Sequence, residues 1–258
     1  KHIAAGHFDL DQPLLPLLPD GYVHVQHPWR ARGRTSPVQD PRLARVNARM
    51  VLSHTSGLPN WSAGPLAFEH EPGARWQYSG EGFMLLQRVI EHLESAPLHV
   101  WTRRFFFESL GMHRSSFLHD EHTLAREVGG EVATSTARFE RPVAAASLLT
   151  TAGDYARFVA ALLSDEARLS VTLRTPVDVA PSLGIRWGLG WGLHDGNGGR
   201  HIWHWGNNPG FRSFVIASPD SGDGFVLLTN HRRGLMAARR VVDALLDLFL
   251  RNTSDLER

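Results

Sequence analysis

The sequence lacks cysteine, has almost no lysine, shows no excess of one charge and contains no long hydrophobic run. Without cysteine, the chain forms neither disulfide bonds nor a thiol nucleophile, and cysteine-ligated metal sites are excluded. With 27 Lys+Arg against 26 Asp+Glu, the net charge of +1 gives no overall field that selects nucleic acid. The apolar runs are far shorter than the roughly 18 residues of a transmembrane helix. We therefore expect no nucleic-acid partner and no transmembrane segment.

Lysine occurs only at position 1, so arginine supplies all the other formal positive charges. A mechanism that needs an internal lysine is therefore excluded for residues 2–258. The remaining composition is that of an ordinary globular protein, with 42% hydrophobic and 21% charged residues. A chain of 258 residues buries a substantial core in one large domain or in two lobes.

Helical periodicity dominates residues 1–180, which we predict to form a mainly helical lobe. Apolar residues over 83–93 fall on one face of a helix. The same reasoning predicts helices over 98–110 and from Thr150 to Leu163. Residues Lys1–Ala5 are predicted to be the end of a further helix, which Gly6 stops.

The pattern changes to short strands from residue 181 onward. Bulky residues alternate with glycine over 185–193, and short apolar runs follow at 211–217 and 225–228. A periodic segment over 235–250 predicts a helix that covers one face of the resulting sheet. We therefore predict an α+β fold, in which residues 181–258 form the C-terminal part of an α/β lobe with an antiparallel sheet flanked by helices.

The first candidate site is the glycine-bounded turn that carries Tyr78 and Ser79. A loop there can present polar side chains to a cleft. A phenol transfers protons if a cationic neighbour lowers its pKa from about 10. The alternative is structural, with Tyr78 packed half-buried and Ser79 capping the next helix. Taken alone, these residues favour the structural alternative.

The second candidate is His204, on a predicted strand that leads to Gly206. Glycine there lets a ligand approach the backbone closely, and histidine titrates near physiological pH. The alternative is an aromatic strand with a hydrogen-bonded histidine. Ser53 and His54 do not have the spacing of a nucleophile and its base, and the sequence has no G-x-S-x-G motif. Residues 53–59 are therefore predicted to be a structural turn.

The 15 histidines raise the question of a metal site. His119 and His122 are three residues apart, as are His201 and His204. Residues at that spacing on a strand face opposite sides, and neither cysteine nor an H-E-x-x-H motif is present. We therefore predict no metal and no cofactor, and keep a histidine-ligated metalloprotein only as the weakest alternative.

Five segments taken together resemble the serine β-lactamase-like family, which includes class C β-lactamases, DD-peptidases and related esterases. They are Gly6–Leu14, Val51–Pro59, Pro72–Gly80, Leu148–Asp154 and His204–Gly206. The resemblance implies a serine hydrolase that acts through an acyl-enzyme on a small ester, amide or peptide substrate. It implies an esterase or peptidase type of enzyme in preference to a true β-lactamase. Proteins of this family are commonly exported, so it also implies an exported or periplasmic protein.

The resemblance also assigns roles to individual residues. Tyr78 matches the family's proton-transferring tyrosine, and His204 matches the strand residue that binds the substrate carboxylate. Histidine in place of lysine makes that binding depend on pH. The implied substrate-binding positions are Ser79, Gly80, Trp205, Gly206 and Asn207, the last through a backbone N–H donor to the oxyanion. Gly80 stands where asparagine is usual, and Trp205 stands where a hydroxyl residue is usual.

The family's nucleophile is the serine of a Ser-x-x-Lys motif at the start of a helix. Because lysine is absent beyond position 1, no such motif lies within residues 1–258. We expect Lys1–Ala5 to be the tail of the nucleophile helix, with the nucleophile and the first strands of the sheet encoded upstream. The chain alone is then expected to be inactive. The alternative is a non-catalytic binding protein that keeps the cleft without the chemistry.

Overall fold

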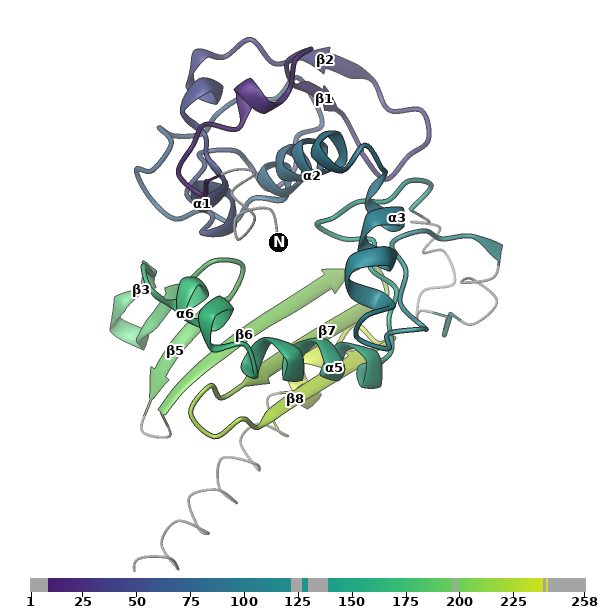
Figure 1. Ribbon diagram of the computed structural model, residues 1–258, viewed down its shortest axis with the longest axis vertical. Helices are drawn as coiled ribbons and strands as arrows, with labels where there is room; N and C mark the ends of the chain where they lie inside the picture. The colour runs from purple at the N-terminus through teal and green to yellow at the C-terminus, as the bar shows by residue number, and fades with distance from the viewer. Residues whose placement is uncertain (1–8, 122–126, 130–138, 197–198, 239, 241–258) are drawn as a thin grey trace, which may run out of the picture.

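The computed structural model describes residues 9–121, 127–129, 139–196, 199–238 and 240. The predicted helix end at Lys1–Ala5 and most of the predicted helix over 235–250 lie outside these residues. The described chain forms a lobe of helices and a small hairpin next to a larger antiparallel sheet that carries helices of its own (Figure 1). The predicted α+β fold is confirmed. In this part of the chain, no helix is both long enough and apolar enough to cross a membrane.

The first lobe contains two α-helices, two 3-10 helices and a two-stranded antiparallel sheet. In chain order its elements are η1 (Leu15–Leu17), β1 (Val23–Val25), β2 (Thr35–Pro37), η2 (Pro41–Arg45), α1 (Ala48–Leu52) and α2 (Gly80–Glu94). Both α-helices begin at a side-chain cap, because Asn47 accepts from the N–H of Met50 and Ser79 accepts from the N–H of Gly82. The helix predicted over 83–93 is therefore confirmed, and it starts three residues earlier.

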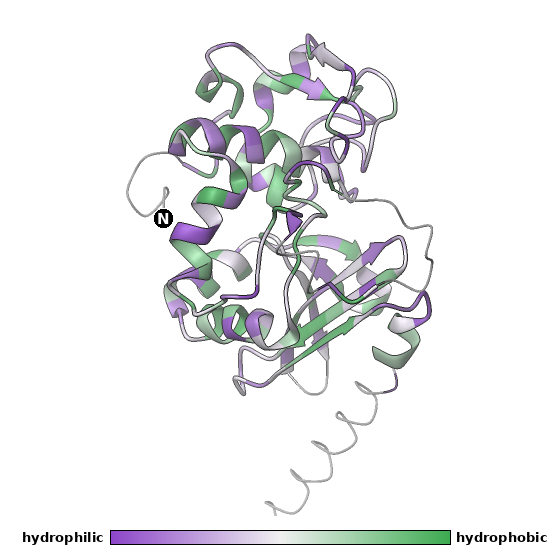
Figure 2. Ribbon diagram, turned by 90° about the vertical axis from the view of Figure 1, so that its right-hand side faces the viewer, coloured by the Kyte–Doolittle hydropathy of each residue, from purple (hydrophilic) through white to green (hydrophobic). Residues whose placement is uncertain are grey.

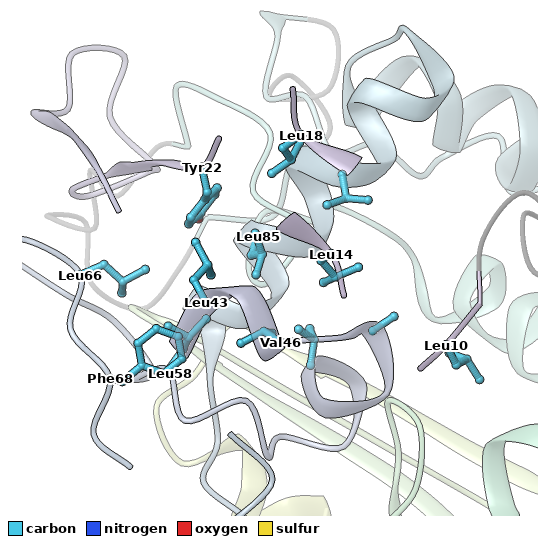
Figure 3. Packing of buried hydrophobic residues seen from close by; sticks show 13 residues of the cluster. Leu10, Leu14, Leu18, Tyr22, Leu43, Val46, Leu58, Leu66, Phe68 and Leu85 are labelled. Carbon is cyan, nitrogen blue, oxygen red and sulfur yellow. The ribbon is translucent and has the colours of Figure 1, made fainter. Parts of the chain in front are cut away.

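A hydrophobic cluster fills the space between these elements (Figure 3). Leu14, Leu58 and Leu85 have no solvent exposure within it. Val89 lies on the apolar face of α2 that the sequence periodicity predicts, and Phe83, Leu86, Ile90 and Leu93 of that face are partly buried against the cluster. Leu85 does not belong to the predicted face, yet it is fully buried as well. This cluster fixes α2, and with it the loop that precedes the helix.

The helix predicted over 98–110 is shorter than predicted and changes its geometry. It runs as α3 (Leu98–Thr102) and continues as the π-helical turn η3 (Arg103–Phe107). In this turn, the N–H of Glu108 donates to the carbonyl of Arg103 at 3.0 Å. A π turn is wider than an α turn and rotates the side chains that follow it. Phe107 is buried there and stacks on Phe117, with ring centroids 6.1 Å apart.

The second part of the chain forms a six-stranded sheet in which every neighbouring pair is antiparallel. Its strands follow one another in chain order, so the predicted antiparallel sheet is a meander. Its elements are α5 (Ala152–Leu163), α6 (Glu166–Leu173), β3 (Val177–Ala180), η4 (Pro181–Leu183), β4 (Ile185–Trp187), β5 (Gly192–Gly196), β6 (Gly199–Asn208), β7 (Phe211–Ala217) and β8 (Gly224–Thr229). Strand β7 coincides with the apolar run predicted over 211–217.

One face of this sheet is covered by α5. Val159 and Leu162 of the helix pack against Ile202 of β6 and Val215 of β7. Hydrophobic residues are concentrated along these strands and on the helices beside them (Figure 2). Both α5 and α6 precede residue 180 yet belong to the sheet layer (Figure 1). The division of the chain at residue 180 into two domains stays a prediction.

The turn between β4 and β5 joins the sheet to the first lobe. The N–H of Gly190 donates to the carbonyl of Leu52 at 2.8 Å, at the end of α1. Leu189 packs against the hydrophobic cluster of the first lobe. Trp187 is almost fully buried at the same junction. The first lobe and the sheet therefore meet through packed side chains as well as through the backbone hydrogen bond of Gly190.

A glycine in β5 allows the strand to lie under a tryptophan of β6. Gly192 pairs with Trp203, and a Cβ atom at position 192 would lie 2.4 Å from the indole ring. We expect Gly192→Ala to lower the free energy of unfolding by about 1–3 kcal/mol, because the ring and strand must shift. Urea unfolding of the purified chain measures this. Gly64→Ala is the matched control, since a Cβ there meets nothing within 4 Å; equal losses in both variants would contradict the packing explanation.

Candidate functional site

Tyr78 and His204 come from different layers of the fold and meet at the junction between them. Tyr78 lies in the loop before α2, and His204 lies on β6, with ring centroids 6.3 Å apart. Trp187 contacts both rings, at 6.1 Å and 5.4 Å between centroids. The two candidates are separated by more than a hundred residues in the sequence, and the fold brings them to one place.

The phenol of Tyr78 has its pKa raised above the usual value because the side chain is partly buried. No cationic group of the described residues lowers it, so the condition set by the sequence analysis for an ionisable phenol is not met. The phenol is therefore protonated at neutral pH. In this state it serves as a proton donor or as a hydrogen-bond donor.

The imidazole of His204 is uncharged at neutral pH, because burial lowers its pKa below the usual value. Its Nδ1 lies 2.9 Å from the carbonyl oxygen of Trp205. A carbonyl oxygen only accepts hydrogen bonds, so Nδ1 carries the proton and donates it. The other ring nitrogen, Nε2, is left with a free lone pair. His204 can therefore accept a hydrogen bond from a ligand while it is neutral.

From His204 onward, β6 has a paired side and an open side. Strand β5 pairs with β6 only as far as Trp203, whereas β7 pairs with it as far as Asn208. Among the described strands, residues 204–208 therefore have a neighbour only on the β7 side. An open strand edge of this kind can bind an extended ligand through backbone hydrogen bonds.

The three predicted substrate-binding positions of β6 lie on this open stretch. Trp205 is 42% exposed, and Asn207 is also exposed. A Cβ atom at Gly206 would lie 2.3 Å from the hydroxyl of Ser213 on β7, so the Ser213 side chain would have to rotate to admit a larger residue there. The substrate-binding roles of all three residues stay predictions.

Ser79 is a buried helix cap, and its hydroxyl is occupied by protein partners. It is 1% exposed, and its hydroxyl accepts from the N–H of Gly82 and donates to the carbonyl of Pro59, both at 2.9 Å. The bond from Gly82 is the helix cap that the structural alternative predicted for Ser79, and the bond to Pro59 is an additional contact. A substrate contact through this hydroxyl would require both bonds to break, so the structure favours the structural alternative.

The space beside Gly80 is filled by neighbouring residues. Its N–H donates to the backbone carbonyl and to the side-chain Oδ1 of Asn60, at 3.1 Å each. A Cβ atom on Gly80 would lie 2.7 Å from the Asn60 carbonyl oxygen and 2.9 Å from the ring of Trp61. The side chain that the family usually carries at this position therefore does not fit here without movement.

His54 is a site neighbour that the sequence analysis missed. Residues 53–59 form the predicted turn, with Gly57 at φ 82°, but the ring of His54 lies on the ring of Tyr78, 4.2 Å away between centroids. Its centroid is also 5.0 Å from that of Trp187. The run of short polar residues before Pro59 signals a turn, and nothing in it shows which side chain the turn would touch.

The hydroxyls of this turn are not free to act as nucleophiles. Ser53 is 3% exposed and donates to the carbonyl of Arg49 at 2.8 Å. Ser56 has no exposure and accepts from the N–H of Leu58 at 3.3 Å. Unlike these serines and the buried Ser79, the side chains of Tyr78 and His204 are partly exposed at this junction.

The described residues bring no three potential ligands together for a metal ion. His122 lies outside these residues. Its predicted partner, His119, has its Nε2 atom 2.9 Å from the carbonyl oxygen of Ser147, a protein hydrogen bond.

Solved structures with the same fold include enzymes and penicillin-binding proteins. A D-amino acid amidase from Ochrobactrum anthropi SV3 has a TM-score of 0.72 and 22% identity, covering 95% of this chain and 79% of that one. A penicillin-binding protein from Bacillus halodurans has a TM-score of 0.74 and 20% identity, covering 95% and 81%. A class C beta-lactamase mutant has a TM-score of 0.66 and 17% identity, covering 89% and 73%.

None of the curated proteins compared with the sequence gives a significant match. The sequence itself matches the Beta-lactamase family over residues 2–248, which is most of its length. The resemblance inferred from the five segments is thereby confirmed, and the chain belongs to the Beta-lactamase family.

Proposed function

We propose that this chain is a fragment of a serine acyl hydrolase that acts through an acyl-enzyme on a small ester, amide or peptide. Membership of the Beta-lactamase family supports a hydrolase. The observation that carries the proposal is the convergence of Tyr78 and His204, 6.3 Å apart between ring centroids, beside the open edge of β6. In acyl transfer, a proton donor can serve the leaving group and a strand edge can bind the substrate backbone beside the nucleophile.

In the proposed reaction, the oxygen of an activated serine attacks the substrate carbonyl carbon, and the serine proton passes to its base. The bond from that carbon to the leaving oxygen or nitrogen then breaks. The neutral phenol of Tyr78 supplies a proton to the leaving group and is reprotonated by proton return from the base. Water then hydrolyses the acyl-enzyme, which restores the serine hydroxyl and releases the acid.

We propose that the serine lies in a Ser-x-x-Lys motif upstream of Lys1. Two observations support this. No lysine follows position 1, so residues 1–258 contain no such motif. Three serines lie in the 53–59 turn or next to Tyr78, and all are buried and hydrogen-bonded: Ser53, Ser56 and Ser79.

The substrate is proposed to be of the esterase or peptidase type. Because His204 is neutral at pH 7, it offers no fixed positive charge to the carboxylate of a penicillin-like substrate. One structure with the same fold is an amidase that was crystallised with L-phenylalanine amide, a small amide.

The second candidate function is a binding protein that keeps the cleft without catalysis. It is favoured by the two departures from the family's motifs, Gly80 and Trp205. The space at Gly80 is occupied by protein atoms, so a substrate amide finds no side-chain partner there. The experiments below separate the two candidates.

The first prediction concerns the nucleophile. The purified chain of residues 1–258 should not be labelled by a fluorophosphonate probe, because it carries no activated serine. A product expressed with the upstream coding sequence should contain an in-frame Ser-x-x-Lys two to three helical turns before Lys1 and should be labelled stoichiometrically. Mass spectrometry measures both outcomes. Stoichiometric labelling of residues 1–258 alone would place the nucleophile within this chain, and a stop codon upstream would contradict the proposal.

The second prediction concerns Tyr78. In the labelled longer product, Tyr78→Phe should lower the turnover of a p-nitrophenyl ester about 100-fold or more, because the proton donor is removed. Tyr155→Phe is the matched control, since Tyr155 packs against the sheet cluster away from the junction. The steady-state rate is the measurement. An unlabelled, inactive product that still binds amides would favour the binding protein.

The third prediction concerns His204. Burial lowers the pKa of this imidazole, so it should remain neutral as the pH falls below the usual value of about 6.5 and become charged only at lower pH. Affinity for a carboxylate ligand should therefore rise at low pH. NMR titration of the ring nitrogens measures the midpoint, with His204→Gln used for assignment. A midpoint at or above 6.5 would show that burial does not control the charge.

A further inference from the structure

His54 contacts the Tyr78 loop at three points. Its backbone carbonyl accepts from the N–H of Gln77 at 2.7 Å, and its ring Nδ1 accepts from the N–H of Ser79 at 3.1 Å. The face of its ring lies on Tyr78, with centroids 4.2 Å apart and an angle of 34° between the planes. One residue therefore binds both backbone neighbours of Tyr78 and packs against the phenol ring itself.

The backbone and the ring of His54 are themselves held in place by neighbouring residues. Its N–H donates to the carbonyl of Val51 at 3.1 Å, which ties it to the end of α1. Its ring is 1% exposed and is surrounded by Trp76, Phe83 and Trp187. Its backbone lies in the left-handed region at φ 55°, where a non-glycine residue is uncommon and is retained only when its surroundings require it.

The hydrogen bond to Ser79 fixes which nitrogen carries the proton. Because Nδ1 accepts an N–H, the proton of the neutral ring must be on Nε2. If Nδ1 carried a proton, its N–H and the N–H of Ser79 would be two donors facing each other with no acceptor between them. Burial lowers the pKa of His54 to about 3, and the nearby His204 acts in the same direction. Tyr78 is the other titratable group in contact with the ring, and it is neutral at this pH.

We propose that His54 is the positioning residue of Tyr78: by holding Gln77 and Ser79 it fixes the place of the phenol ring beside His204. This inference rests on the proposed role of Tyr78 in proton transfer. His54 makes no contact with the reacting atoms in this role. It supplies the fixed geometry that proton transfer requires over a short distance.

Two variants of the chain separate the acceptor from the ring. His54→Phe keeps an aromatic ring and removes the acceptor, which leaves the buried N–H of Ser79 unpaired. His54→Asn keeps an acceptor oxygen on the γ carbon and tolerates the left-handed backbone. In the Phe variant, we expect exchange of the Ser79 amide with deuterium to be about tenfold faster or more, and in the Asn variant to stay close to wild type.

The pKa of Tyr78 gives a second readout, taken at the phenol itself. Partial burial raises this pKa, so release of the loop in His54→Phe should lower it towards 10, and His54→Asn should lie closer to wild type. Tyr155 is the internal control, because burial in the sheet layer raises its pKa to about 12 and His54 does not contact it. Carbon-13 NMR of labelled tyrosine measures both.

The proposal is overturned if the Phe variant keeps wild-type protection of Ser79, or if Ser79 is released while the pKa of Tyr78 does not change. If the Phe variant does not fold, the proposal is tested on the wild-type chain instead. Nitrogen-15 NMR then measures which ring nitrogen of His54 carries the proton and at what pH the ring titrates. We expect the Nε2–H form of His54 down to about pH 4, and an Nδ1–H form or a midpoint near 6.5 would overturn the proposal. Failure of the proposed function is distinguishable, because it would be seen as full ester turnover in Tyr78→Phe.

Discussion

The site depends on the packing of Trp187 against the first lobe. This side chain belongs to the sheet, yet its ring contacts His54 and Tyr78 of the helical lobe and His204 of its own sheet. Trp187 is 2% exposed, so its indole ring is buried between the helical lobe and the sheet. The hydrogen bond between Gly190 and Leu52 holds the same junction from the backbone. Tyr78 and His204 come from the two different layers. The distance between them therefore depends on the packing of Trp187 and on the hydrogen bond between Gly190 and Leu52.

The elements of the fold follow from local patterns in the sequence. The helix α2 and the strand β7 were predictable because periodicity and turn residues act over a few neighbouring positions. The predicted helix over 98–110 was wrong in its length and geometry, because burial of Phe107 against the distant Phe117 accompanies a π turn. Periodicity within one segment does not include such a contact.

The site was predictable only in part, and for a similar reason. Tyr78 and His204 could be found because they lie in segments with a family resemblance. The contacts of His54 with Gln77 and Ser79 cross more than twenty residues and join two loops without regular structure. Neutrality of the two histidines arises from burial at a junction of two layers, and a sequence carries no direct signal of it.

Asn60 and Trp61 lie so close to Gly80 that a substitution at any of these three positions affects the other two. An asparagine at position 80 cannot be acquired alone, since its first side-chain atom would meet a backbone oxygen as well as an indole ring. The order of substitutions therefore matters: the segment around Trp61 has to withdraw before any side chain can enter. Substitutions at position 80 and in the segment of Asn60 and Trp61 are therefore expected to occur together.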